Sequence, residues 1–286
     1  MTTVTAFAPA KINLFLHVGG LAADGYHPLS SWMVFADFGD EVRIRAASAD
    51  LFEVHGPFAK GVPLDGGNLV LKARDAVRGE GRPCAIQLTK RLPPASGLGG
   101  GSSDAAATLR ALAELYDLPL RQLGDAAPGL GADVPACLRA RSLIATGRGE
   151  RLDTAPSAPD LHAVLVNPGV ETATGKVFQA YDKGPPGGEE TPILPARFSN
   201  LEELVHVLTK TRNDLEAPAR ALHPEIDEVL TALSAVAESR FVRMSGSGAT
   251  CFALCNSGSD AEKVAAAIQS THPAWWVKTC TLITSQ

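Results

Sequence analysis

The chain has 286 residues, a length that suggests two domains or one large one. Hydrophobic residues make up 45% of it and charged residues 20%, which excludes a disordered chain, because such a chain lacks the apolar content to offset conformational entropy. The net charge is −5 and no long basic tract is present, which argues against non-specific binding to nucleic acid. A small phosphorylated ligand held by local donors is compatible with this charge.

The cysteines and the N-terminal residues indicate the cellular compartment in which the protein is expected. The five cysteines form no CxxC pair and the seven histidines no metal-type pair, so neither a disulfide framework nor a metal site is predicted. No stretch reaches the roughly 18 apolar residues of a membrane span. No basic region precedes the apolar residues of the N-terminus, which argues against a signal peptide. A cytoplasmic protein is therefore expected, with no membrane, nucleic-acid or obligate protein partner.

The N-terminal residues alternate or run apolar, as strands do. Residues 3–18 predict a pair of strands broken at Pro9, because proline cannot donate to a β-ladder. Residues 32–46 predict a strand, a turn around Gly39-Asp40 and a second strand.

Two further elements precede a glycine-rich loop, and a long helix follows it. A helix is predicted over 68–77 and a strand over 84–90. Either Ser102 or Ser103 can cap the helix after the loop. The apolar face of that helix is predicted from Ala106, Leu109, Ala113 and Tyr116.

The stretch DTAPSAPD at 153–160 has little apolar content and is the predicted domain boundary, which gives domains over 1–155 and 160–286. Strands and helices interleave without a strict βαβα order, which predicts an α+β fold. The elements predicted after the boundary are strands over 161–167, 241–244, 249–255 and 275–283, a Pro/Gly-rich loop over 184–195, a helix begun by Pro224, and a helix capped by Ser259 and Glu262.

The strongest local signal is the run PPASGLGGGSSDAA at 93–106. Four glycines in five positions permit positive φ angles and leave the backbone unshielded. A helix begins at once, and its first amides have no intrahelical partner. Together with the helix dipole they predict a site for a di- or triphosphate. A flexible linker is the alternative, but the strand before and the helix after the run favour phosphate binding.

Two common nucleotide motifs do not match. The nearest Walker A candidate, at 169–177, has one residue too many between its glycines, and Val177 stands where Ser or Thr should ligate magnesium. A dinucleotide fingerprint fails because its third glycine would fall on Ser102 or on Cys251.

The run at 93–106 resembles the central motif of the GHMP kinases, small-molecule kinases whose phosphate loop is not of the Walker type. PAKINL at 9–14 and MSGSGAT at 244–250 agree with two further motifs of that family in order and spacing. The runs DGYH, GADVP at 131–135 and NDLE at 213–216 resemble the branch that phosphorylates the 2-hydroxyl of diphosphocytidyl-methylerythritol in non-mevalonate isoprenoid synthesis. The resemblance covers nearly the whole chain.

The resemblance implies a two-domain α+β GHMP kinase fold. Its N-terminal domain would be ribosomal-S5-like and its C-terminal domain ferredoxin-like, with ATP and substrate between them. The last strand is a candidate to return to the N-terminal domain.

Asp133 and Lys11 match the catalytic pair of the family, although each alone would be an ordinary surface charge. Phosphoryl transfer to an alcohol requires removal of the hydroxyl proton, which a nearby carboxylate can accept. A lysine beside that carboxylate keeps it charged and stabilises charge on the attacking oxygen. The resemblance thus implies that Asp133 is the general base and Lys11 its electrostatic partner.

The resemblance also implies ligand contacts. Tyr26 would stack on cytosine, His27 would hydrogen-bond to it and Phe178 would supply a second aromatic face. Aromatic packing in a turn is the alternative for Tyr26 and His27. The expected ATP contacts are Asn68, Lys90, Pro94, Ala95, Ser96, Gly97, Leu98, Gly99, Gly100, Gly101, Ser102, Ser103 and Asp104, and the other expected substrate contacts are Asn13, Gly246 and Ser247.

Magnesium is expected to arrive with ATP, which carries the metal on its phosphate oxygens. Ser102 and Ser103 are candidate protein ligands, and no acidic ligand is assigned, because Asp104 also suits the helix N-terminus. Two positions depart from the family pattern: Pro28 stands where a polar residue is expected, and Trp32 stands where Phe is usual.

Two alternatives stay open at this point. Another GHMP kinase, acting on homoserine or mevalonate, is disfavoured by Tyr26-His27 and by the run at 131–135. A non-catalytic ligand sensor on the same fold is disfavoured by the presence of both Lys11 and Asp133.

Overall fold

The computed structural model describes residues 2–79 and 81–284. Its contacts divide the chain into two compact units, each of which is discontinuous in sequence. The domain boundary predicted at 153–160 stays a prediction. The first unit contains Met1–Lys11, Phe38–Pro94 and Gly99–Ala140, and the second contains Ile12–Asp37, Ala95–Leu98 and Arg141–Gln286. The long strands β1 (Thr3–Val18) and β2 (Leu29–Ala46) contribute to both units.

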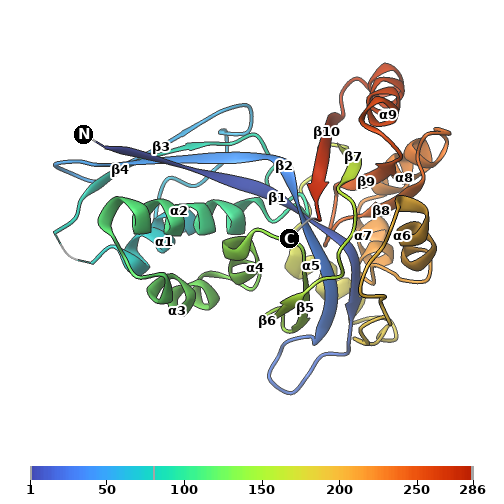
Figure 1. Ribbon diagram of the computed structural model, residues 1–286, viewed down its shortest axis with the longest axis horizontal. Helices are drawn as coiled ribbons and strands as arrows, with labels where there is room; N and C mark the ends of the chain where they lie inside the picture. Colours follow the sequence, from blue (N-terminus) through green and yellow to red (C-terminus); the bar gives the residue numbers. More distant parts are fainter. Residues whose placement is uncertain (1, 80, 285–286) are drawn as a thin grey trace. The chain divides into compact units, whose positions relative to one another are not determined.

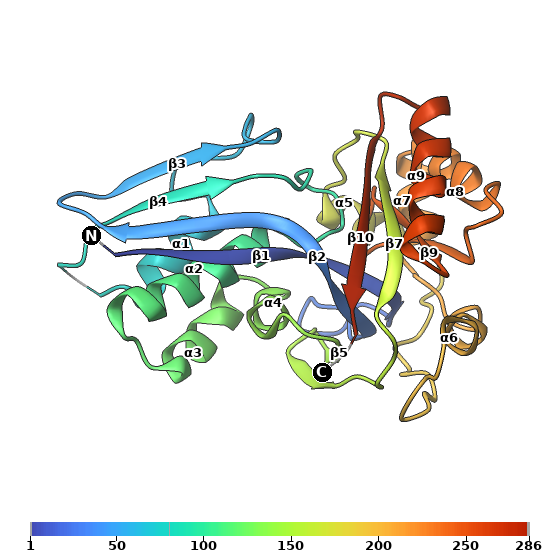
Figure 2. The same cartoon turned by 45° about the horizontal axis from the view of Figure 1, so that its top comes forward.

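The first unit is a small sheet with helices on one side (Figures 1 and 2). Its strands lie in the order β3-β4-β2-β1, and β3 runs parallel to β4 while β2 runs antiparallel to it. Asn68 caps α1 by accepting a hydrogen bond from the Val70 amide, as the predicted helix requires. The remaining elements of this unit are β3 (Leu51–His55), α1 (Leu69–Val77), β4 (Cys84–Thr89), α2 (Gly100–Tyr116), α3 (Leu120–Leu130) and α4 (Val134–Arg139).

The strand pair predicted over 3–18 is wrong, because β1 is one continuous strand. Among the described strands of the first unit, β1 pairs only with β2, so its other edge makes no ladder with them. An edge strand tolerates Pro9, since the missing N–H can fall on the unpaired side.

The turn predicted at Gly39-Asp40 is also wrong, because β2 runs straight through it. A Cβ at Gly39 would lie 2.1 Å from the carbonyl oxygen of Ala8. Glycine is present there so that the backbones of β1 and β2 can approach each other. Asp40 is fully buried and accepts hydrogen bonds instead of turning the chain.

Two predicted helix caps lie elsewhere. Helix α2 begins at Gly100, so Ser103 falls in its first turn and donates to the Pro9 carbonyl. Helix α9 (Gly258–Thr271) is capped by Ser257, which accepts from the Asp260 amide, and not by Ser259. In both cases the helix starts earlier than the serine pattern indicated.

The second unit contains an antiparallel sheet in the order β2-β10-β7-β9-β8. The four strands predicted in the second half of the sequence are all present. Strand β10 also pairs with Phe35 and Ala36 of β2. The strands of this unit other than β2 are β5 (Leu143–Gly147), β6 (Arg151–Thr154), β7 (Leu161–Asn167), β8 (Phe241–Met244), β9 (Cys251–Cys255) and β10 (Trp276–Ile283).

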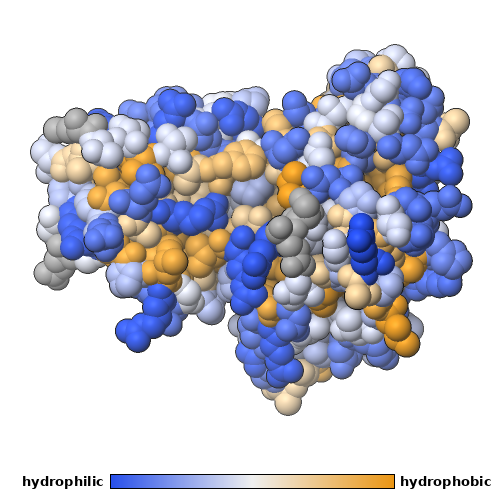
Figure 3. Space-filling view, viewed as in Figure 1, coloured by the Kyte–Doolittle hydropathy of each residue, from blue (hydrophilic) through white to orange (hydrophobic). Residues whose placement is uncertain are grey.

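Helices cover this sheet with apolar faces. Helix α8 packs on β8 and β9, and α9 packs on β7 and β10. The outward side of α9 is mainly hydrophilic (Figure 3), while Ala261, Val264 and Ile268 are buried. The helices of this unit are α5 (Thr174–Tyr181), α6 (Leu201–Leu208), α7 (Glu216–Leu222), α8 (Glu225–Ser234) and α9. Among the described residues, no helix has the length and apolar character that a membrane crossing needs.

Candidate active site

In the first unit, Lys11 and Asp133 form an ion pair. The Nζ atom of Lys11 lies 3.3 Å from Oδ2 of Asp133. Lys11 comes from β1, and Asp133 immediately precedes α4. The Lys11 side chain is 5% exposed, whereas that of Asp133 is 34% exposed. The carboxylate is therefore held by a buried cation and still open to a ligand.

Gly99 brings the glycine-rich run against this pair. It precedes α2 in a left-handed conformation, with φ of 63°. A Cβ at Gly99 would lie 3.0 Å from Cε of Lys11 and 3.8 Å from Oδ2 of Asp133. The amide-rich first turn of α2 thus begins next to a lysine and a carboxylate, which places an anion-binding helix end beside a candidate base.

A buried charge cluster lies in the same unit. Nζ of Lys90 donates to Oδ2 of Asp104 at 2.8 Å and also to Oδ2 of Asp40. The second oxygen of Asp104, Oδ1, is buried without a hydrogen-bond partner among the described residues. Burial raises the pKa of Asp104 to about 7, with Asp40 adding to the effect and Lys90 opposing it. Burial alone would lower the pKa of Lys90, but the two carboxylates outweigh it and raise that pKa.

In the second unit, residues 95–98 of the glycine-rich run pack against the turn after β8. A Cβ at Gly97, whose φ is 78°, would lie 2.2 Å from the carbonyl oxygen of Ser245. The Ser245 hydroxyl donates to the Gly97 carbonyl at 3.1 Å and accepts from the backbone N–H of Asn13 at 3.2 Å. Only glycine at 97 allows this close approach of backbone to backbone.

Side chains from other segments hold the turn after β8 in place. Asn213 donates from Nδ2 to the carbonyls of Met244 and Gly246, at 2.9 and 2.8 Å. The Ser247 hydroxyl lies 2.9 Å from that of Thr174 in α5. The predicted substrate residues Asn13, Gly246 and Ser247 are therefore brought together: Gly246 and Ser247 lie in the turn after β8, and Asn13 of β1 donates to Ser245 of that turn. Ser245 of the turn and Thr174 of α5 take part in the same hydrogen bonds, although they were not among the predicted contacts.

The predicted base-recognition residues also lie in the second unit. His27 packs against Phe178 with ring centroids 4.9 Å apart, and its Nε2 lies 2.7 Å from Oδ1 of Asp182. Tyr26 is 57% exposed, and the Arg148 guanidinium lies 4.5 Å from its ring centroid. The structure thus places Phe178 and Asp182 against His27, and the roles predicted for Tyr26, His27 and Phe178 at the base stay predictions.

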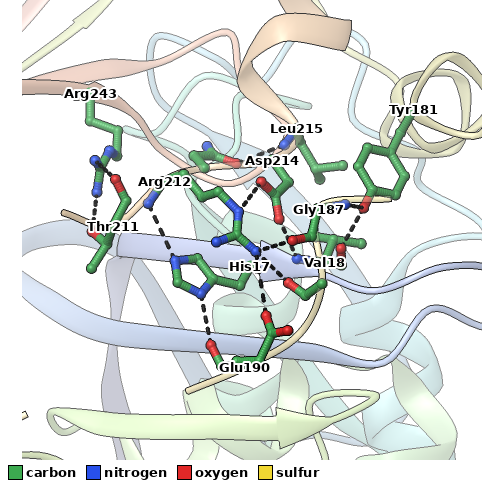
Figure 4. Close-up of polar contacts among 12 residues, drawn as sticks. His17, Val18, Tyr181, Gly187, Glu190, Thr211, Arg212, Asp214, Leu215 and Arg243 are labelled. Carbon is green, nitrogen blue, oxygen red and sulfur yellow. Dashed lines mark hydrogen bonds and ion pairs between the residues drawn. The ribbon is translucent and has the colours of Figure 1, made fainter. Parts of the chain in front are cut away.

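A polar network fixes the loop between α5 and α6 (Figure 4). Arg212 donates from Nε to Asp214 at 2.6 Å and from Nη2 to the Gly188 carbonyl at 2.6 Å. Oδ2 of Asp214 accepts from the Val18 amide at 2.7 Å. This loop is therefore tied to the end of β1 and to the segment before α7.

His17 completes that network as a neutral ring (Figure 4). Its Nδ1 lies 2.8 Å from the Glu190 carbonyl, and its Nε2 accepts from the Arg212 amide at 3.3 Å. One nitrogen must donate and the other must accept, which a neutral imidazole does and a protonated one does not. Burial lowers the pKa of His17, in agreement with these partners.

Several predicted contacts already have partners within the protein. Asn68 caps α1 and donates to the Pro63 carbonyl. Ser103 donates to Pro9, and Lys90 holds two carboxylates. Trp32, which was not a predicted contact but a departure from the family pattern, is fully buried and donates to Ser142. The roles predicted for Asn68, Lys90 and Ser103 at the nucleotide stay predictions.

The described residues contain no group of three or more His, Cys, Asp or Glu side chains placed to hold a metal ion. Oxygen donors near the glycine-rich run are present in the first turn of α2, where Ser102 is partly exposed and Oδ1 of Asp104 has no hydrogen-bond partner in the described part of the chain. Such oxygens suit a hard cation that keeps most of its ligands on a phosphate.

Family models match both parts of the sequence. The model of the GHMP kinases N-terminal domain matches residues 68–141, and that of the GHMP kinases C-terminal domain matches residues 196–274.

Curated relatives match over nearly their whole lengths. The 4-diphosphocytidyl-2-C-methyl-D-erythritol kinase of Caulobacter vibrioides is 52% identical over 290 residues, which cover 98% of this chain and 99% of that protein. The enzyme of the same name from Mesorhizobium japonicum is 51% identical, covering 96% of this chain and 94% of that protein.

Solved structures agree. A crystal structure of 4-(cytidine 5'-diphospho)-2C-methyl-D-erythritol kinase matches with a TM-score of 0.74 and 32% identity, covering 98% of this chain and 100% of that one. The mevalonate kinase of L. major matches with a TM-score of 0.72 at 16% identity, covering 100% and 97% of the two chains, and so shares the fold.

Proposed function

The chain belongs to the GHMP kinase family and is a small-molecule kinase, and we propose from this that it transfers the γ-phosphoryl group of ATP to the 2-hydroxyl of 4-diphosphocytidyl-2-C-methyl-D-erythritol. The observation that carries the proposal is the Lys11–Asp133 ion pair, with Gly99 against it. The near full-length similarity to relatives that carry this name supports the choice of acceptor.

Asp133 is the general base in this proposal. It takes the proton of the 2-hydroxyl while the hydroxyl oxygen bonds to the γ-phosphorus and the bond between that phosphorus and the ADP oxygen breaks. The 34% exposure of its side chain leaves it accessible to an alcohol. Lys11, held at 3.3 Å, stabilises the negative charge that grows on the attacking oxygen.

The glycine-rich run and the first turn of α2 hold the phosphates. Amides at the start of a helix favour an anion, and Gly100 and Gly101 present no side chain in front of them. Magnesium, when bound with ATP, neutralises phosphate charge, and Ser102 is the protein oxygen best placed to contact it.

The cytidine is recognised by the His27 environment in the second unit. His27 offers a ring nitrogen to the base edge, and Tyr26 exposes an aromatic surface for stacking. The turn at residues 245–248, with Asn13, contacts the rest of the substrate. A cytoplasmic location, expected from the sequence, is part of the same proposal.

The test is ATP consumption by the purified protein with the cytidyl substrate, homoserine and mevalonate in parallel. Turnover of the cytidyl substrate alone, with phosphorus NMR locating the new phosphate on the 2-oxygen, supports the proposal. Turnover of homoserine or mevalonate in preference would overturn it in favour of another family activity. ATP binding without turnover of any acceptor would instead indicate a ligand sensor.

A further inference from the structure

The imidazole of His27 is held by the C-terminal end of α5. Phe178 lies 4.9 Å away, centroid to centroid, and Tyr181 meets the ring edge-on at 5.8 Å and 72°. Asp182, which follows the last residue of α5, places Oδ1 2.7 Å from Nε2 of His27. These three positions, spaced three and four residues apart, share one side of a helix. The His27 side chain is only 9% exposed, so its orientation is set by this helix.

Helix α5 is itself anchored by its residue Tyr181. The Tyr181 hydroxyl donates to the Val18 carbonyl and accepts from the Gly187 amide, the latter at 2.8 Å (Figure 4). Tyr181 is buried, so these two bonds tie α5 to the end of β1 and to the following loop. The ring of His27 therefore packs against a fixed surface.

The hydrogen bond to Asp182 decides which imidazole nitrogen carries the proton. An ionised carboxylate only accepts, so Nε2 of a neutral His27 must be the donor. Nδ1 is then left with a lone pair. No hydrogen bond to Nδ1 is made by residues 2–79 or 81–284, so this acceptor is available to a ligand.

An acceptor at this position distinguishes the two common pyrimidines. The exocyclic group of cytosine is an amine, which donates, whereas uracil carries a carbonyl oxygen at the same place, which accepts. When cytosine faces Nδ1, its amine donates a hydrogen bond to this nitrogen. When uracil does so, the lone pair of its carbonyl oxygen faces the lone pair of Nδ1, and the two repel each other. We infer that Asp182 is a positioning residue that makes the site selective for cytosine over uracil by holding His27 with the proton on Nε2. The inference rests on the proposed function, since it concerns how that substrate is recognised.

The experiment compares kcat/KM for the cytidine and uridine diphosphate forms of methylerythritol at pH 8. In Asp182→Asn the amide can donate to Nε2, which turns Nδ1 into a donor. We expect the cytidine-to-uridine ratio to fall about ten-fold or more, with KM for ATP unchanged. Asp182→Glu keeps a carboxylate and should retain most of the ratio. Asp153→Asn, an exposed carboxylate in the same unit, is the matched control.

A second readout observes the ring directly. Nitrogen-15 NMR of labelled histidine should show His27 protonated on Nε2 in the unaltered protein. In Asp182→Asn the proton should lie on Nδ1, or the ring should exchange between the Nε2-protonated and Nδ1-protonated tautomers. Equal loss of kcat/KM on both substrates with an unchanged ratio would indicate a purely structural role and overturn the inference alone. No turnover of the cytidyl substrate by the unaltered protein would overturn the proposed function, and this inference with it.

Discussion

The ammonium of Lys11 lies 3.3 Å from Oδ2 of Asp133, and Gly99 is the residue that allows the glycine-rich run to approach both. Lys11 is in the first strand and Asp133 precedes a short helix far along the chain, so their meeting is a product of folding.

Replacing Asp133 by Asn should lower kcat by roughly 10²–10⁴-fold, because the amide cannot accept the hydroxyl proton. KM for ATP should change little, since Asp133 acts on the acceptor. Steady-state kinetics with the cytidyl substrate measure both quantities. Asp125→Asn, an exposed carboxylate on α3, serves as the control. Full activity of Asp133→Asn would remove Asp133 as the base.

Gly99→Ala should reduce both activity and stability. A left-handed conformation costs a residue with a Cβ about 1–2 kcal/mol, and this Cβ would also press on Lys11 at 3.0 Å. Activity should fall because Lys11 must move from Asp133. Gly124→Ala in α3, where a Cβ would meet nothing within 4 Å, is the control and should be neutral or slightly stabilising. Equal behaviour of the two variants in thermal unfolding and turnover would contradict this account.

Asp104→Asn should stabilise the protein increasingly as the pH rises. Burial raises the pKa of Asp104 to about 7, from an unfolded value of 3.8. The folded chain therefore keeps a proton that the unfolded chain has already released, and the stability linked to it is present below pH 3.8 and lost as the pH rises through about 7. Asn does not titrate and still offers an oxygen to Lys90. Midpoints of thermal unfolding at pH 5.5 and 8 measure the difference, which should favour Asn more at pH 8; a difference independent of pH would refute the assignment.

His17 should make the second unit sensitive to acid. Burial lowers its pKa below 6.5, so the folded state keeps the ring neutral after the unfolded state has begun to take up a proton. The associated stability is complete above pH 6.5 and is lost as the pH falls to the lowered pKa. His17→Asn keeps a donor toward Glu190 without titrating, so its thermal midpoint should fall less between pH 7.5 and 5 than that of the unaltered protein. His55→Asn, at a half-exposed ring, is the control and should follow the unaltered protein; parallel curves for His17→Asn would contradict the prediction.

Much of the local structure could be predicted, because short-range patterns carry it. The helix predicted over 68–77 is present as α1, the alternating run at 84–90 forms β4, and the four later strands are present where alternation and punctuation indicated. The glycine-rich run with its following helix, and the three ordered motifs, were sufficient for the family.

Several local signals had more than one structural meaning. Gly39-Asp40 predicted a turn, yet Gly39 serves the close approach of β1 and Asp40 serves as a buried partner of Lys90. A glycine followed by an aspartate is typical of both situations, and only the neighbouring strand distinguishes them. Asp182 carried no signal of its own, because its importance depends on His27 from a distant turn; the spacing of four residues from Phe178 is the one clue that was available.

By itself, the sequence determined the family, most of the described strands, the helices α1, α2, α8 and α9, and the residue types that phosphoryl transfer requires. Tertiary structure decided which polar side chains lie in contact: Lys11 with Asp133, a pair that the family resemblance had suggested, and Lys90 with Asp40 and Asp104 and His27 with Asp182, which no sequence pattern indicated. The physical reason is that hydrogen bonds and ion pairs act over a few ångströms, whereas these partners are far apart in sequence or lie on opposite sides of a loop. Periodicity and capping report only the nearest residues along the chain, so such pairings become visible only after the backbone has folded.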